Sequence, residues 1–227
     1  KQKEALSIQQ VVEEAIYKFS KENVLVTAAG RTDTGVNAYG QVASFDLTVE
    51  HEPHNVMYSI NHFCKPYKIG VTNCELVDND FNARFSAKHR HYVYKILNRR
   101  APNIINAGLQ CWIMDHLDVY LMIKGASYLI GKHDFATFCK PDAGATTIRT
   151  LAKFNWERGS DGFLRADLIG DAFCYSMVRN MVGAVACVAE GRFEPEWIKT
   201  ILNDKTRISD SLVFPARGLT LQSIAYQ

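Results

Sequence analysis

This sequence of 227 residues lacks the features that mark several large classes of protein. No apolar run approaches the roughly 18 residues that a membrane-spanning helix requires, and the chain begins with Lys-Gln-Lys-Glu, so we expect neither a membrane span nor a signal peptide. None of its six cysteines shows Cys-x-x-Cys spacing, which predicts free thiols in a cytoplasmic protein. No Gly-rich phosphate-binding fingerprint, heptad pattern or sustained repeat occurs.

Metal-binding patterns are also missing. The seven histidines form no His-Glu-x-x-His motif. His51 and His54 are interpreted as a solvated pair near the start of a helix, in preference to half of a metal site. The sequence therefore implies no metal.

Acidic residues are absent between residues 81 and 114, although the net charge of the whole chain is only +2. The basic residues of that segment are Arg84, Lys88, Arg90, Lys95, Arg99 and Arg100. A segment with charge of one sign is a candidate surface for phosphate groups. We take Lys88, Arg90, Arg99 and Arg100 as candidate phosphate contacts, and the alternative for each is a solvated surface charge.

The most informative stretch runs from Gly30 to Ala38 and reads Gly-Arg-Thr-Asp-Thr-Gly-Val-Asn-Ala. It lies between two apolar runs, residues 24–26 and 41–47, which predict strands. Its glycines let a bulky ligand come close to Asp33. The alternative is a tight turn that carries a solvated pair of Asp33 and Arg31.

A second candidate residue, Arg179, is the only ionisable charge between Asp171 and Glu190, in an otherwise apolar helical pattern. An unpaired guanidinium costs several kcal/mol to bury, so this one must meet a carboxylate, a phosphate or water. An arginine that extends to the surface from the polar side of the helix is the alternative.

Hydrophobic periodicity predicts both helices and strands along the chain. Helices are expected at residues 7–21, from 53, at 117–130, at 172–189 and from 195. Further strands are expected at residues 68–77, 90–96, 148–156, 163–168 and 219–226. This order of elements, with helices on one side of the strands, indicates an α+β fold and not a doubly wound one.

Four separated segments resemble the tRNA pseudouridine synthase A family and follow that family's order across nearly the whole chain. The loop is similar to the family pattern GRTD-x-GVHA, residues 81–94 are similar to FHARFSA followed by RxYxY, and residues 177–183 are similar to MVRNxVG. The fourth segment is residues 218–221. Asn37 and Asn82 stand where the family has histidines, which leaves open the RNA contacts of those two positions.

The resemblance implies an enzyme that isomerises uridine to pseudouridine in the anticodon stem-loop of tRNA, without a cofactor and usually as a homodimer. Asp33 matches the family's catalytic aspartate, Arg31 its companion arginine, and Arg179 the arginine that pairs with the aspartate. Tyr92 matches the active-site tyrosine, on which we expect the flipped uracil to stack, and Leu219 is expected to contact substrate. Whether Asp33 attacks the sugar or acts along a glycal-type route is left open.

The same resemblance implies two similar α/β halves whose antiparallel or mixed sheets join into one continuous sheet. Helices are expected on one side of it, and an active-site cleft between the halves. We assign residues 1–84 to the half with the aspartate loop and residues 85–227 to the half with the RxYxY strand and the MVRN helix. In the family a strand and a loop precede the first helix, whereas this sequence starts at the helix.

Three other interpretations were weighed. The chain could be an RNA-binding module in which Asp33 is structural, or a pseudouridine synthase of the same family that acts on another RNA. Asp33-Thr34-Gly35 is also the triplet of aspartic proteases. That chemistry needs two carboxylates that share a proton, and the chain has no second copy of the triplet, so a protease is disfavoured.

Overall fold

The computed structural model describes residues 6–140, 144, 146–205 and 213–227, which form a mixed α+β fold with five α-helices and a large mixed sheet. The chain divides into two compact units. The first unit comprises Lys1–Arg31 and Val42–Ser86, and the second comprises Thr32–Gln41 and Ala87–Gln227. The aspartate loop beyond Arg31 therefore belongs to the second unit. The predicted halves, divided between residues 84 and 85, stay a prediction.

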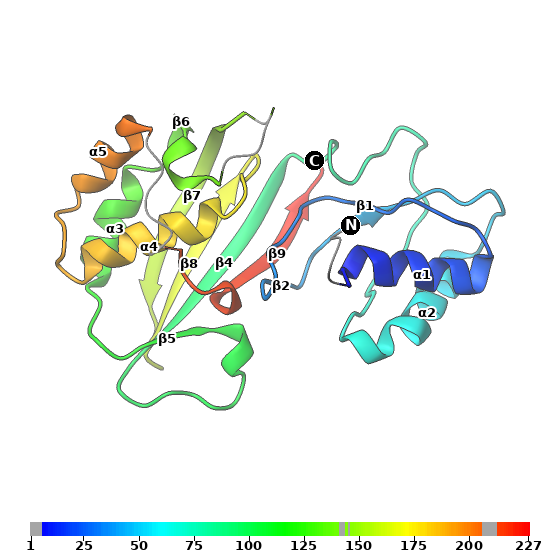
Figure 1. Cartoon of the computed structure of the whole chain (residues 1–227), viewed down its shortest axis with the longest axis horizontal. Coiled ribbons are helices and arrows are strands. Elements are labelled where there is room, and N and C mark those ends of the chain that lie inside the picture. Colours follow the sequence, from blue (N-terminus) through cyan, green and yellow to red (C-terminus); the bar gives the residue numbers. More distant parts are fainter. Residues whose placement is uncertain (1–5, 141–143, 145, 206–212) are drawn as a thin grey trace. The chain divides into compact units, whose positions relative to one another are not determined.

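Two helices form the framework of the first unit. Helix α1 (Ile8–Ser20) begins after Ser7, whose Oγ accepts a hydrogen bond from the backbone N–H of Gln10 at 3.2 Å. Helix α2 (Pro53–Cys64) lies beside α1 (Figure 1). A short antiparallel ladder joins β1 (Thr27–Ala28) to β3 (Ala43–Ser44). The buried core of this unit consists of Val11, Ala15, Ile16, Val26, Val56, Ile60 and Cys64.

The strand predictions for the first unit were largely wrong. Residues 24–26 and 68–77 form no strand, and the strand expected at 41–47 is reduced to β3. Side chains satisfy these backbone groups in place of a ladder. A carboxylate oxygen of Glu13 accepts the N–H of Val26 at 3.3 Å. The amide of Asn61 bonds both the N–H of Val71, at 2.6 Å, and its carbonyl, at 2.8 Å.

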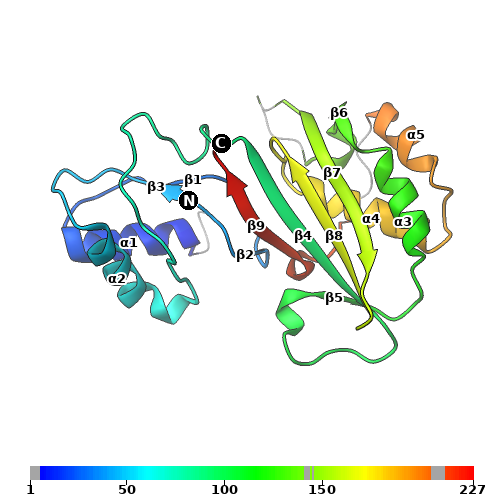
Figure 2. The ribbon, with the colours of Figure 1, turned by 180° about the vertical axis from the view of Figure 1, so that it is seen from behind.

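A seven-stranded sheet organises the second unit, in the order β2-β9-β4-β8-β7-β6, with β5 also paired to β4 (Figure 2). The strands are β2 (Asn37–Ala38), β4 (His89–Asn98), β5 (Cys111–Ile113), β6 (Gly131–Asp134), β7 (Ile148–Arg158), β8 (Phe163–Gly170) and β9 (Leu219–Ala225). The pairs β2–β9 and β4–β5 are parallel and the others antiparallel. Within the described residues, the β1–β3 ladder is separate from this sheet.

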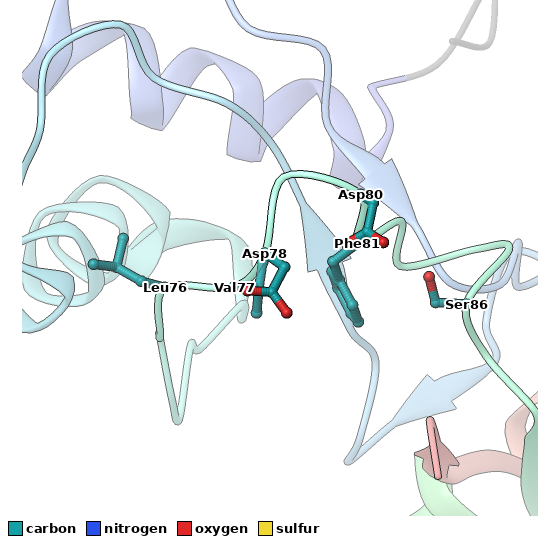
Figure 3. Close-up of a pocket in the computed structure, with 6 residues that line it drawn as sticks. All are labelled: Leu76, Val77, Asp78, Asp80, Phe81 and Ser86. Atoms are coloured by element: carbon teal, nitrogen blue, oxygen red, sulfur yellow. The ribbon is translucent and has the colours of Figure 1, made fainter.

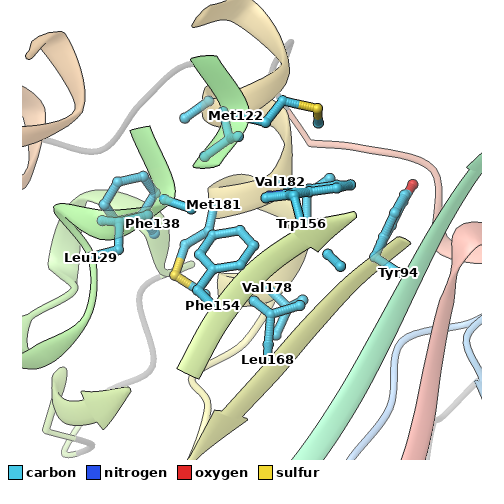
Figure 4. Close-up of a cluster of buried hydrophobic side chains, with 14 of the residues drawn as sticks. Tyr94, Met122, Leu129, Phe138, Phe154, Trp156, Leu168, Val178, Met181 and Val182 are labelled. Atoms are coloured by element: carbon cyan, nitrogen blue, oxygen red, sulfur yellow. The ribbon is translucent and has the colours of Figure 1, made fainter. Parts of the chain in front are cut away.

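Helices α3 (Val119–Ser127) and α4 (Met177–Ala189) cover one face of the seven-stranded sheet, and α5 (Trp197–Asp204) follows α4 along the chain (Figures 1 and 2). Strict alternation of buried residues along β8 directs one row of apolar side chains to a core that it shares with α4 (Figure 4). The helix predicted at 172–189 begins only at Met177, because Ser176 adopts a left-handed conformation with φ +61°. None of the described helices has the length and apolar character needed to cross a membrane.

Candidate active site

Asp33 and Arg179 are in direct contact, although 146 positions separate them in the sequence. Nη1 of Arg179 donates to Oδ2 of Asp33 at 2.7 Å. The side chain of Asp33 is only 13% exposed and that of Arg179 only 19%, so little water screens the ion pair. The apolar helix thus presents its single charge to a carboxylate, which is one of the three partners that its burial required.

The Asp33 loop is held by a tight turn and by a strand. The N–H of Val36 donates to the carbonyl of Asp33 at 3.0 Å, and Gly35 adopts φ +84°, a conformation that glycine accepts without strain. The next residues form β2, which pairs in parallel with β9. The Nδ2 of Asn37 donates to the carbonyls of Gly108, at 3.1 Å, and Arg217, at 3.4 Å. Asn37 therefore fastens the Asp33 loop to the segments that contain Gly108 and Arg217.

Arg179 is held with equal firmness by α4 and its neighbours. Every residue of α4 other than Arg179 is buried. Nε of Arg179 donates to the carbonyl of Phe214 at 2.6 Å, and this bond fixes the plane of the guanidinium. The adjacent Asn180 anchors the helix, since its Nδ2 donates to the buried carbonyl of Phe138 at 2.7 Å. The cation is consequently oriented before any ligand arrives.

Ser176, which sequence reasoning missed, completes the surroundings of the carboxylate. Its hydroxyl donates to the same Oδ2 of Asp33, at 3.3 Å. The other oxygen, Oδ1, has no hydrogen-bond partner among the described residues. The N-terminus of α4, which begins next to Ser176, adds the positive end of its helix dipole to this anion. No direct signal for this contact is present in the sequence, because a serine before a helix normally indicates a cap.

Tyr92 lies on β4, opposite Leu168 on β8 and Leu221 on β9. It is 7% exposed, and its ring meets that of Phe173 edge to face, with 5.2 Å between the ring centroids. Burial, opposed by Arg90 and assisted by the nearby charge of Asp33, raises the pKa of Tyr92 to about 12. Its phenol is thus neutral at physiological pH, so the hydroxyl can donate a proton in a hydrogen bond.

Tyr94, two residues along the same strand, serves the fold. Its side chain is fully buried, and its hydroxyl donates to the carbonyl of Pro215 at 2.7 Å. Its ring leaves no room beside it, since a Cβ on Gly218 would lie 2.5 Å from the ring carbon that bears the hydroxyl. Tyr94 is therefore a packing residue of the sheet.

Two of the predicted phosphate contacts use part of their guanidinium within the fold. Nη1 of Arg90 donates to the carbonyls of Ala87 and Asp171. Nε of Arg99 donates to the carbonyl of Ala101 at 2.9 Å. These bonds orient both side chains, and in Arg99 they leave other nitrogens of the guanidinium for a further acceptor.

The remaining predicted site residues are more scattered. Lys88 and Arg100 have exposed side chains, as suits contacts with a polyanion. Leu219 is buried at the first position of β9, opposite Tyr94. Arg31 is exposed and belongs to the first unit. The structure therefore brings together Asp33 and Arg179 directly, with Tyr92 in electrostatic reach of the carboxylate.

The first unit carries an open hollow of its own (Figure 3). Its lining consists of Leu76, Val77, Asp78, Asp80, Phe81 and Ser86. Two carboxylates without a basic side chain in the lining do not suit a polyanionic ligand. Beside it, Oδ1 of Asn82 accepts the N–H groups of Arg84, at 3.0 Å, and Phe85, at 3.1 Å, so this replacement of a family histidine stabilises a turn.

The described residues contain no cluster of three or more His, Cys, Asp or Glu side chains that could hold a metal ion. All six cysteines are free thiols, as their spacing predicted.

Comparison with known proteins gives matches over most of the chain. A family model described as tRNA pseudouridine synthase matches residues 126–227. A protein of Ehrlichia canis (strain Jake), named tRNA pseudouridine synthase A, is 38% identical over 224 residues, which cover 97% of this chain and 90% of that protein. A protein of Leifsonia xyli subsp. xyli (strain CTCB07) with the same name is 38% identical over 246 aligned positions, which cover 100% of this chain and 85% of that protein.

Proposed function

The chain belongs to the tRNA pseudouridine synthase A family, and from this premise we propose that it isomerises uridine to pseudouridine in the anticodon stem-loop of tRNA, with Asp33 as its essential carboxylate. The observation that carries the proposal is the ion pair between Asp33 and Arg179. It joins two segments that resemble the family in separate parts of the sequence. It also leaves one carboxylate oxygen, Oδ1, without a hydrogen-bond partner among the described residues.

The reaction needs a carboxylate beside the sugar. The bond between uracil N1 and ribose C1′ breaks, the base turns over, and C5 bonds to C1′; C5 loses a proton and N1 gains one, so the change is an isomerisation without net redox. An ionised carboxylate can add to C1′, or can remove a proton from the sugar along a glycal-type route. Both routes require a carboxylate oxygen that faces the ribose, and in this chain we assign that oxygen as Oδ1 of Asp33.

Base flipping sets the role of Tyr92. A uridine that leaves its stack costs a few kcal/mol. Stacking on an aromatic ring returns roughly 1–3 kcal/mol, so one tyrosine offsets much of the cost. We assign Tyr92 as the residue on which the flipped uracil stacks, because the charge of Asp33 is near enough to affect its pKa. The raised pKa keeps the phenol neutral beside the carboxylate.

The other assignments rest on family membership and on exposure. Arg31 holds the flipped nucleotide, and Leu219 contributes an apolar contact to substrate. Lys88, Arg90, Arg99 and Arg100 contact phosphates of the tRNA. We further propose that the chain forms a homodimer. We also propose that it is cytoplasmic, since its six free thiols suit a reducing compartment. The two-halved fold with a cleft, which the family implies, is part of the same proposal.

The test uses unmodified tRNA transcripts, with carbodiimide-stable adducts mapped by primer extension at every uridine. Asp33→Asn should abolish adduct formation while the affinity for tRNA stays within a few fold, since phosphate contacts supply most of the binding energy. Asp46→Asn is the matched control, because Asp46 is an exposed aspartate of the first unit. It should keep wild-type turnover.

Two outcomes would contradict the proposal. Near wild-type turnover by Asp33→Asn removes Asp33 from the reaction. Tight tRNA binding by the wild-type chain without any adduct would favour the RNA-binding module instead.

A further inference from the structure

The conformation of Ser176 is unusual for its position. It is the residue that precedes α4, where a serine side chain normally accepts a hydrogen bond from the first turn of the helix. In this chain the side chain makes no such bond, and the backbone sits at φ +61°, ψ +5°. A non-glycine residue in that region is strained by about 1–3 kcal/mol, and such strain gathers at functional sites.

Instead of capping the helix, the hydroxyl of Ser176 bonds the carboxylate of Asp33. It donates to Oδ2 at 3.3 Å, and Nη1 of Arg179 donates to the same oxygen at 2.7 Å. Two donors on one oxygen define the rotation of the carboxylate about its side-chain bonds. The consequence is that Oδ1 keeps its acceptor capacity for a ligand, because no described residue donates to it.

Both donors are fixed to one rigid element. Ser176 directly precedes α4 and Arg179 lies in its first turn, so the start of one helix positions both donors. All other residues of that helix are buried, and Asn180 ties its first turn to the carbonyl of Phe138. The distance between the two donors therefore cannot vary much, and the carboxylate must adapt to them.

From this geometry we propose that Ser176 is a positioning residue: with Arg179 it fixes Oδ2 of Asp33, so that Oδ1 is the oxygen presented to the ribose. The proposal rests on the proposed function, because it assigns a purpose to the orientation of the reacting carboxylate. Ser176 itself touches no reacting atom. Its strained backbone is the structural cost of placing a hydroxyl there.

Two substitutions separate the hydroxyl from the backbone. Ser176→Gly removes the hydroxyl and relieves the strain, since glycine adopts positive φ freely. It should melt near the wild-type temperature, yet turn over about tenfold more slowly, with KM and the Kd for tRNA within about twofold. Ser176→Thr keeps the hydroxyl but strains a β-branched residue. It should melt lower than wild type, yet keep kcat within about threefold when assayed below its melting temperature.

Lys68→Gly is the control for relief of strain, because Lys68 also has positive φ, at +56°, and lies in the first unit. It should leave turnover unchanged. Ser176→Gly is thus expected to lose kcat at nearly unchanged stability, and Ser176→Thr to lose stability at nearly unchanged kcat. A purely structural serine would not separate the two effects in this way.

The outcomes are distinct from those that test the proposed function. If the wild type forms pseudouridine and Asp33→Asn does not, while Ser176→Gly is as fast as wild type, the positioning role alone is overturned. Equal losses of kcat in the glycine and threonine variants also overturn it, because backbone conformation would then explain both. A wild-type chain that forms no pseudouridine overturns both proposals.

Discussion

The two units satisfy their backbones in different ways. In the second unit, β4 alone pairs with β5, β8 and β9, and long ladders account for most of the sheet. In the first unit, the only ladder among the described residues joins two strands of two residues each. There, side chains such as those of Glu13 and Asn61 bond the backbone where a strand had been expected. Ladders supply a rigid frame, whereas bonds from single side chains each depend on one residue.

This difference explains the placement of the ion pair. Asp33 and Arg179 both belong to the unit with the extended sheet and the larger core. A positioned carboxylate needs supports that do not move, and a buried helix against a seven-stranded sheet supplies them. The two units should therefore respond differently to substitution.

The largest effect is expected from Arg179→Met in the second unit. It leaves the carboxylate of Asp33 without its cation at a site that is 13% exposed, and breaking such a pair costs about 3–5 kcal/mol. Asp33→Asn should also destabilise, because it removes the counter-charge of the guanidinium. The double variant should be more stable than the sum of the single changes indicates, with a coupling of about 1–3 kcal/mol. Denaturant unfolding of the four proteins measures this, and additive effects would show that the two charges do not interact in solution.

A smaller effect is expected from Gly218→Ala, which tests how closely the sheet is packed. The added Cβ would lie 2.5 Å from the ring of Tyr94, a buried side chain that cannot withdraw. We expect a loss of about 2–3 kcal/mol in unfolding free energy. Gly108→Ala is the matched control, because nothing lies within 4 Å of its added Cβ. It should change stability by less than about 0.5 kcal/mol. Equal changes in unfolding free energy for Gly218→Ala and Gly108→Ala would mean that the sheet beside Tyr94 can shift to admit the added methyl group.

The smallest effect is expected in the first unit, from Asn61→Ala. This change removes both hydrogen bonds to the backbone of Val71, at a cost of about 1–2 kcal/mol. The amide of Val71 should then exchange with solvent faster, which hydrogen exchange followed by NMR would detect. Asn55→Ala is the control, because Asn55 is exposed on the same helix, α2. If the Val71 amide exchanges at the wild-type rate in Asn61→Ala, another group supports that segment.

The contrast between ladders in the second unit and single side-chain bonds in the first also explains which strands the sequence could predict. Hydrophobic periodicity predicted β4, β7, β8 and β9. Strand β8 shows the physical basis, because its buried residues alternate strictly and a half-buried ladder imposes a period of two. Periodicity misled at residues 68–77, where the segment alternates but is held by the side chain of Asn61. A bond from one side chain to a distant backbone group leaves no periodicity, so the sequence gives no sign of it.

The candidate site shows the same limit. Burial of a lone cation predicted that Arg179 must meet a carboxylate, a phosphate or water, and in the structure it meets the carboxylate of Asp33. The role of Ser176 depends on a left-handed backbone that no residue preference would suggest for serine. The amide of Asn37 could bond any nearby carbonyl, and only the folded chain specifies those of Gly108 and Arg217.

The position of β9 between β2 and β4 governs when the site can form during synthesis. The hydrogen bond that joins Asn37 to Arg217 spans 180 positions. At about 5–20 residues per second, a ribosome needs roughly 10–40 s to make that stretch. During this interval the aspartate loop has been synthesised, but the strand that will fasten it has not. The nascent chain therefore contains Asp33 for many seconds before this hydrogen bond can hold its loop in place.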